Sequence, residues 1–184
     1  MSNLAETKEY KGYTINIYYD EEPLNPRKDF DNLGVIFSNH RNYNPDGRFF
    51  EELIQGQHTY NFKTLENYLN KIYYWLKVRG YEHSGFTIST SNGYPYNDPW
   101  DSGLFGIIAI EKEVAYNQWG KSNKTKSLAL KCLQGEVETL DMYYRGEVFG
   151  YSITDKLGNE IDSMWGIFGL EYAIQEATDF IDNL

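Results

Sequence analysis

Short segments of the chain alternate between hydrophobic and polar residues, which is the pattern of strands that bury one face. The alternation is clearest over residues 13–19, and residues 4–10 before it have the composition of a hairpin partner. Further segments rich in β-branched and aromatic residues predict strands at 33–40, 86–90, 104–110, 148–154 and 160–165. The turn sequence Lys156-Leu157-Gly158-Asn159 between the last two predicts a second hairpin.

Other segments repeat their hydrophobic residues with the 3.6-residue period of amphipathic helices. Helices are therefore predicted at 64–79, 126–145 and 170–183, with shorter ones at 48–55 and 111–119. Thr64 is placed as the N-cap of the first of these, and Gly80 and Gly146 are placed where helices end.

The order of these elements predicts the fold class. Strands of unlike length are joined by hairpins, and no strand-helix-strand repeat typical of a parallel sheet occurs. We therefore expect one α+β domain over residues 1–184, with an antiparallel sheet of five or six strands covered by three or more helices. Residues 20–31 contain two prolines and are expected to form a loop, as are residues 91–103.

Composition limits the class of protein. The chain has 184 residues, 41% of them hydrophobic, and includes 17 tyrosines, which fits a soluble globular domain. It has no apolar run long enough to span a membrane, and its first ten residues lack the apolar segment of a signal peptide. Cys132 is the only cysteine, so no intrachain disulfide forms, and we expect the cytoplasm as the location.

Acidic charge is concentrated towards the end of the sequence. The net charge is −10, and residues 136–184 hold 11 acidic residues against Arg145 and Lys156 only, a net of −9. A surface of this sign repels nucleic acid, so direct DNA binding is not expected, whereas it attracts basic proteins, including the DNA grooves of nucleases. The alternative is that the acidic charge only keeps the protein in solution.

Carboxylates on the outer faces of the two last long helices and on the strand between them are the candidate partner-binding residues. If the two helices pack side by side, the spacing of these carboxylates resembles that of DNA phosphates. The candidates are Glu136, Glu138, Asp141, Glu160, Asp162, Glu171, Glu176, Asp179 and Asp182. The alternative is an ordinary solvated helix face.

The loop at 91–103 is a second candidate site. Its candidate residues are Asp98, Trp100 and Asp101, and with His40 the two aspartates offer ligands that a hard cation accepts. The alternative is that the aspartates accept backbone N–H bonds in turns. Neither a Gly-x-Ser-x-Gly motif nor a phosphate-binding glycine loop occurs, so no catalytic residue, cofactor or resident metal is predicted.

Several short motifs resemble a known family. They are Asn25-Pro26-Arg27 with Asp31-Asn32-Leu33-Gly34 and His40, Pro99-Trp100-Asp101-Ser102-Gly103 with Gly106, Gly135-Glu136-Val137-Glu138-Thr139, Gly146-Glu147-Val148-Phe149-Gly150-Tyr151, and Asp162-Ser163 with Trp165-Gly166. Over about residues 10–180 the chain resembles a small, mostly uncharacterised protein family of phages and mobile elements of Gram-positive bacteria. The resemblance implies a genomic setting in which small acidic proteins are often anti-defence factors of the antirestriction or anti-CRISPR type. The stretch at residues 93–97 is longer and richer in tyrosine than the corresponding stretch in the family.

Charge and resemblance together predict a stoichiometric inhibitor. The expected target is a host nucleic-acid-targeting nuclease, either a type II CRISPR effector or a restriction enzyme, bound through an acidic surface that imitates DNA. One alternative is a metal-assisted hydrolase or nucleotide-processing enzyme that uses the region of Asp98, Asp101 and His40. Another is a module that forms a homodimer through its tyrosine-rich surface.

Overall fold

The chain divides into two compact units. The computed structural model describes residues 3–54, 62–90 and 101–184. Residues 1–25 and 142–184 form one unit, here called the terminal unit, and residues 26–141 form the other, here called the central unit. The predicted α+β class is confirmed, but the strands in these described ranges form two antiparallel sheets of four strands each in place of one sheet of five or six.

The sheet of the terminal unit joins strands from both ends of the sequence. Its order is β1-β2-β7-β8, in which β1 (Leu4–Tyr10), β2 (Tyr13–Tyr19), β7 (Val148–Thr154) and β8 (Glu160–Phe168) are antiparallel neighbours. Both predicted hairpins are confirmed. The first turns at Lys11 and Gly12, which both have positive φ (48° and 87°), as the tightest hairpin turns require.

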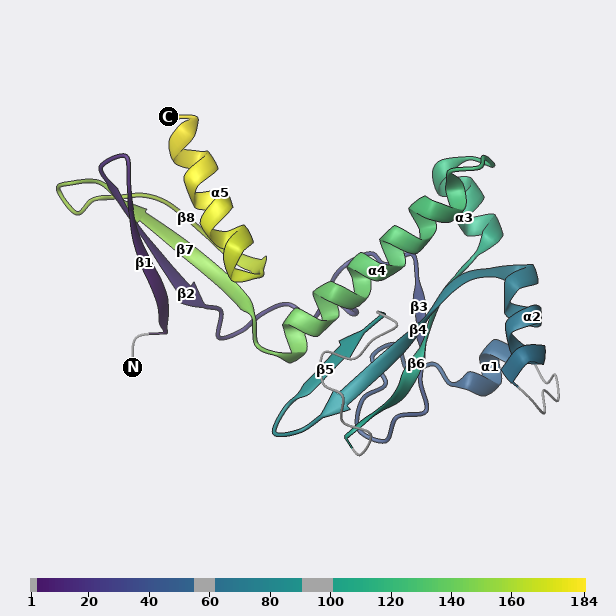
Figure 1. The fold of residues 1–184 in the computed structure, drawn as a ribbon. Helices are drawn as coiled ribbons and strands as arrows, with labels where there is room; N and C mark the ends of the chain where they lie inside the picture. The colour runs from purple at the N-terminus through teal and green to yellow at the C-terminus, as the bar shows by residue number, and fades with distance from the viewer. Residues whose placement is uncertain (1–2, 55–61, 91–100) are drawn as a thin grey trace. The chain divides into compact units, whose positions relative to one another are not determined.

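Helix α5 (Leu170–Asp182) lies along one face of this sheet (Figure 1). Ile15 and Ile17 of β2, at alternate positions, are fully buried in a core with Ala173 and Ala177 of α5. The small alanines allow the helix backbone to approach the sheet closely. Every second residue of β2 faces α5, and the helical period of α5 places its hydrophobic residues on the side that faces β2. The same alternation turns Tyr18 towards the opposite face of the sheet.

The central unit has a sheet of order β3-β6-β4-β5. Its strands are β3 (Val35–Phe37), β4 (Tyr73–Glu82), β5 (Phe86–Ser89) and β6 (Ser102–Glu111). Its helices are α1 (Phe50–Ile54), α2 (Phe62–Ile72), α3 (Lys112–Trp119) and α4 (Thr125–Tyr144), the last of which ends in residues assigned to the terminal unit.

Strand β6 is buried on both faces. Ile107 packs in a cluster with Leu53 of α1 and Leu69 of α2. Ile108 faces the other way, towards the position where Gly34 meets Leu133 of α4. Two-sided cover explains why 104–110 is almost continuously apolar in the sequence and does not alternate.

The helix predicted at 64–79 is wrong over its second half. Helix α2 ends at Ile72, and the chain continues directly as β4, which pairs with β6 from Tyr73 to Tyr81. Four of the six residues at 73–78 are aromatic or β-branched, and pairing with the buried strand β6 outweighs the helical period they share with α2. Gly80 is a strand residue and no helix end, and a side chain there would lie 3.2 Å from Phe86 and from Phe105.

The remaining helices follow the predictions within a few residues. Gly146 ends α4 as expected, with φ of 69° and an N–H donated to the carbonyl of Tyr143. No helix in the described parts of the chain combines the length and apolar character needed to cross a bilayer.

Candidate functional site

The two units differ in net charge. The terminal unit contains 13 acidic and four basic residues, a net of −9, and the central unit contains 14 acidic and 13 basic residues, a net of −1. The acidic charge therefore follows the terminal unit, to which the first 25 residues also belong, and not only the last quarter of the sequence. Of the nine predicted carboxylates, Glu136, Glu138 and Asp141 belong to the central unit.

Helix α5 carries exposed carboxylates on the side away from its sheet. Glu171, Glu176 and Asp179 are exposed, and Asp179 accepts a hydrogen bond from Gln175 at 2.6 Å. Within the described residues none of these three carboxylates forms an ion pair. These three side chains therefore face solvent, as the sequence predicts, and are not neutralised by a basic side chain among the described residues.

Asp182, at the end of α5, is paired. Its carboxylate lies 2.8 Å from the ammonium of Lys11 and accepts a hydrogen bond from the hydroxyl of Tyr10 at 3.3 Å. The bond from Lys11, followed by the one from Tyr10, lowers the pKa of Asp182 below its ordinary value. Asp182 therefore contributes less free charge to a partner than its three neighbours on the helix.

On β8 the two predicted carboxylates have different surroundings. Glu160 is exposed, whereas Asp162 is half-buried and accepts a hydrogen bond of 2.8 Å from the hydroxyl of Tyr151. Burial, and then this bond, raises the pKa of Tyr151 above its ordinary value. Glu160 remains available at the surface, and Asp162 fixes the tyrosine.

Glu136 does not face solvent, which corrects the prediction for this residue. It lies in a cluster around Arg27, here called the Arg27 cluster, whose guanidinium side chain is 2% exposed. The five N–H groups of Arg27 donate to Asp46 (two bonds, 2.8 and 2.6 Å), Asn32 (2.8 Å), Glu136 (2.7 Å) and the carbonyl of Gly34 (2.6 Å). Burial works to lower the pKa of Arg27, but Asp46 and Glu136 outweigh it and hold that pKa above its ordinary value.

The carboxylate of Glu136 is also bound by the backbone. It accepts the N–H groups of Leu33 (2.9 Å) and Gly34 (3.1 Å), so it ties α4 to the segment before β3. Burial, followed by the charge of Glu136, raises the pKa of the Cys132 thiol to about 11, which keeps this cysteine protonated and unreactive near neutral pH. Glu136 therefore has a structural role within the central unit.

Asp141 also faces inward, against the prediction. It accepts hydrogen bonds from the hydroxyl of Thr87 (2.6 Å) and the N–H of Ile88 (2.7 Å), and so holds the edge strand β5 to α4. Glu138, two residues beyond Glu136 on α4, is exposed as predicted and accepts a bond from Gln134 at 2.8 Å. Helix α4 thus contributes one exposed predicted carboxylate where three were expected.

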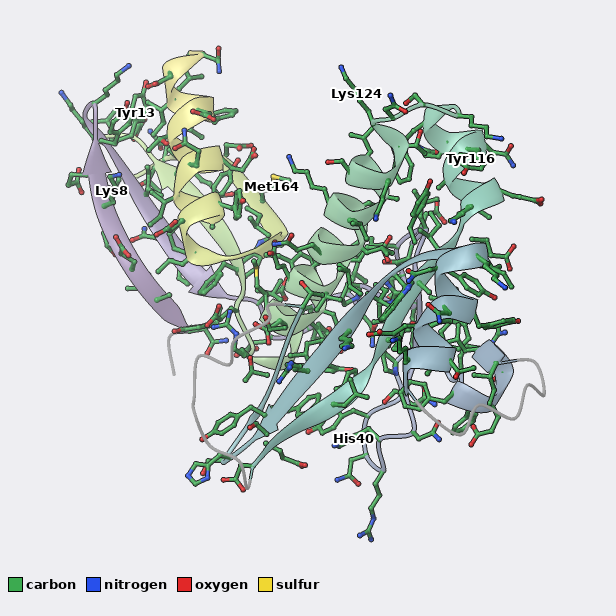
Figure 2. The ribbon with its side chains drawn as sticks, turned by 45° about the vertical axis from the view of Figure 1, so that its right-hand side comes forward. Lys8, Tyr13, His40, Tyr116, Lys124 and Met164 are labelled. Atoms are coloured by element: carbon green, nitrogen blue, oxygen red, sulfur yellow. The ribbon has the colours of Figure 1, made fainter. Side chains whose placement is uncertain are left out.

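The structure brings two residues of the second candidate site together. His40 and Asp101 line one pocket of about 230 Å³ in the central unit, and Glu82 lines it as well. His40 is labelled in Figure 2. The Nδ1 atom of His40 accepts the N–H of Tyr43 at 3.2 Å, so its Nε2 faces Glu82 at 3.7 Å. The carboxylate of Asp101 instead lies 2.8 Å from the imidazole of His83.

The other members of that site are not covered. Asp98 and Trp100 lie outside the described residues. Among the residues that are described, His, Cys, Asp and Glu side chains form no group of three that could hold a metal ion. From its described residues the pocket offers one imidazole and two carboxylates, those of His40, Glu82 and Asp101.

A cleft in the terminal unit was not predicted from the sequence. It has a volume of about 400 Å³ and is here called the Trp165 cleft. Its lining residues are Asn3, Tyr18, Tyr19, Asp20, Glu21, Glu22 and Trp165. The sequence carried two partial signals, the three consecutive acids after a predicted strand and a tryptophan near a strand end, but their proximity depends on the pairing of β2, β7 and β8.

Searches of this chain against family models, curated proteins and solved structures find no match. The structure does show where several of the motif residues quoted above lie: Arg27, Asn32, Gly34 and Glu136 all belong to the Arg27 cluster. In the structure these motif residues bind one another within the central unit.

Proposed function

We propose that this protein binds a basic partner protein in a one-to-one complex through the acidic surface of its terminal unit. The partner class that fits best is a host nucleic-acid-targeting nuclease, a type II CRISPR effector or a restriction enzyme, whose DNA-binding groove is cationic. The inhibitor acts in the bacterial cytoplasm, where such nucleases work.

One observation carries the proposal: a net charge of −9 is confined to one compact unit, and Glu160, Glu171, Glu176 and Asp179 stand exposed on it without basic partners among the described residues. Opposite charges across an interface raise the rate of association and select against anionic competitors. The anti-defence setting implied by the family resemblance supports the same partner class.

The test is inhibition of DNA cleavage. Purified protein is mixed with a type II effector and with restriction enzymes at increasing molar ratio, at two salt concentrations. We expect cleavage to stop near equimolar protein, and the inhibition to weaken at the higher salt because the attraction is screened. Cleavage that continues with excess protein at low salt contradicts the proposal for the enzyme tested.

A matched pair of variants locates the surface. The triple variant Glu171→Gln, Glu176→Gln, Asp179→Asn removes three charges from the terminal unit, and Glu51→Gln, Glu113→Gln, Glu138→Gln removes three exposed charges from the central unit. We expect the first variant to lose inhibition at least tenfold and the second to stay within about twofold of the unchanged protein. Equal losses would mean that only total charge matters.

A second candidate function rests on the pocket that His40 and Asp101 share. An enzyme acting there turns over many substrate molecules and loses activity in Asp101→Ala, whereas an inhibitor must match its target in amount. Assay of the protein with divalent cations and nucleotide or phosphodiester substrates separates the two. Light scattering of the same sample gives its oligomeric state and tests the homodimer.

A further inference from the structure

The Trp165 cleft combines an exposed aromatic ring with carboxylates in one compact unit. Trp165 is 53% exposed, although large aromatic side chains are usually mostly buried. Its ring is stacked with that of Tyr18, with centroids 6.0 Å apart and planes inclined by 28°. Two neighbouring rings of this kind form an apolar surface at the edge of the cleft.

The position of Trp165 is fixed by the strand beneath it. A side chain at Gly150 of β7 would lie 2.3 Å from the Trp165 ring, so the ring rests directly on the backbone of that glycine. The register of β8 against β7 shifts at the same place, between the partners of Phe149 and Tyr151. Such a bulge turns a side chain away from its regular direction, and here it leaves the indole at the mouth of the cleft.

The charge of the cleft is negative throughout. Asp20, Glu21 and Glu22 follow the last residue of β2 in succession, and none of the described residues that line the cleft is basic. Asp20 is held in place, because its N–H donates to the carbonyl of Val148 (2.9 Å) and its carboxylate accepts the N–H of Glu22 (3.0 Å). Glu21 accepts a hydrogen bond from Asn3, and the carboxylates of Glu21 and Glu22 are exposed.

This combination excludes several ligands. Phosphate groups and nucleotides are repelled by three adjacent carboxylates, and an uncharged apolar group would leave those carboxylates facing it. A cation that is also planar fits both parts, because it is attracted to the face of an indole and to carboxylate oxygens together. Among protein side chains the guanidinium of arginine has this shape and charge, and it stacks on aromatic rings better than an ammonium does.

We propose that the Trp165 cleft binds an arginine side chain of the partner protein, with the guanidinium stacked on Trp165 and its N–H groups directed to Glu21 and Glu22. The inference rests on the proposed function, since it names the residue type that the acidic unit recognises. In the DNA-binding grooves of nucleases, arginines bind phosphates, and in type II CRISPR effectors they also bind bases of the short DNA motif (PAM) beside the target. An arginine bound in the Trp165 cleft is not available to bind DNA.

The experiment titrates the full-length protein with peptides that differ only in one side-chain type. The peptides alternate glycine with arginine, with lysine, or with citrulline, which has the shape of arginine without its charge. Dissociation constants are measured by calorimetry at 0.15 M salt, where charges more than about 8 Å away are largely screened. We expect the arginine peptide to bind at least tenfold more tightly than the citrulline peptide and about threefold more tightly than the lysine peptide.

Variants assign the binding to the cleft. Trp165→Ala is expected to weaken binding of the arginine peptide about five- to tenfold, and Trp165→Phe less, because a smaller ring remains. Glu22→Gln, an exposed change that leaves the core intact, is expected to weaken it about threefold. The control Glu113→Gln removes the same charge from an exposed position on α3 of the central unit, outside the cleft, and should change the affinity less than 1.5-fold. Thermal melting confirms that each variant is folded.

The outcomes separate the cleft from the proposed function. Equal binding of the arginine and citrulline peptides, or equal effects of Glu22→Gln and Glu113→Gln, would overturn the arginine site, and inhibition of a nuclease by the same protein would still stand. Arginine binding that depends on Trp165, with no inhibition of any nuclease tested, would keep the cleft and reject the partner class. If the lysine peptide binds strongly and Trp165→Ala does not weaken that binding, the cleft attracts positive charge in general and does not select arginine.

Discussion

The terminal and central units contain nearly equal numbers of acidic residues but use them differently. In the central unit Glu136, Asp141 and Asp46 are bound by Arg27 or by backbone N–H groups, and basic residues almost cancel the acidic ones. In the terminal unit four basic residues face 13 acids, and the carboxylates of α5 stand in solvent. Sequence position does not distinguish the two kinds of carboxylate, whereas burial and partners do.

The largest test of this difference is removal of Arg27. Arg27→Ala leaves Glu136 and Asp46 as buried charges without their partner, which destabilises a protein by about 3–5 kcal/mol. Urea unfolding should show this loss. The control Arg145→Ala removes one partner of an ion pair in the terminal unit whose side chains are 41% and 38% exposed, and should cost less than about 1 kcal/mol. Similar losses in the two variants would erase the contrast between the units.

A second test compares two glutamates on one helix. Glu136→Gln keeps the size of the side chain but removes the charge that faces Arg27, and we expect a loss of about 2–3 kcal/mol. Glu138→Gln, two residues further along α4, changes an exposed side chain and should stay within about 0.5 kcal/mol. The free energies of unfolding in urea measure both effects. If Glu136→Gln costs as little as Glu138→Gln, Glu136 is a surface carboxylate available to a partner, as first predicted.

A third test uses two glycines with opposite expectations. Gly150→Ala in the terminal unit places a methyl group against the Trp165 ring and should cost about 1–2 kcal/mol. Gly135→Ala in α4 meets no atom within 4 Å and should stabilise the protein by about 0.5–1 kcal/mol, because alanine favours a helix more than glycine does. Melting temperatures should therefore move in opposite directions, and a neutral Gly150→Ala would show that Trp165 does not rest on that strand.

The smallest expected effect concerns the exposed acids themselves. Glu160→Gln with Glu176→Gln removes two surface charges from the terminal unit and should change the free energy of unfolding by no more than about 0.5 kcal/mol. Urea unfolding at low and high salt measures it. A loss above about 1 kcal/mol would mean that these carboxylates stabilise the fold, and that their exposure is no sign of a binding surface.

Most elements were predictable because their signals are local. The hairpins at residues 4–19 and 148–168 and the amphipathic helix α5 each show their period within one short segment. The helix predicted at 64–79 failed after Ile72 because its second half pairs with β6, about 30 residues further along the chain. The local helical pattern in that segment was real, and a nonlocal partner outweighed it.

The candidate sites were less predictable for the same reason. Glu136 was assigned to an outer helix face, but its partner Arg27 is 109 residues away in the sequence. The Trp165 cleft joins residues near both ends of the chain, and the sequence does not show which strands are neighbours. Charge counts identified the acidic character of the protein, and only the sheet order assigned that charge to one compact unit.

The pairing of Ile15 with Ile153 has a consequence for biosynthesis. While the chain leaves the ribosome, β1 and β2 emerge first and must wait for β7, β8 and α5, whereas nearly all of the central unit emerges in between and can fold meanwhile. Once folded, the central unit brings the two waiting ends closer together and shortens the effective loop that β2 and β7 must close. A chain that ends before β7 therefore lacks the partner strand of β2, so the acidic surface of the terminal unit forms only once β7, β8 and α5 are present.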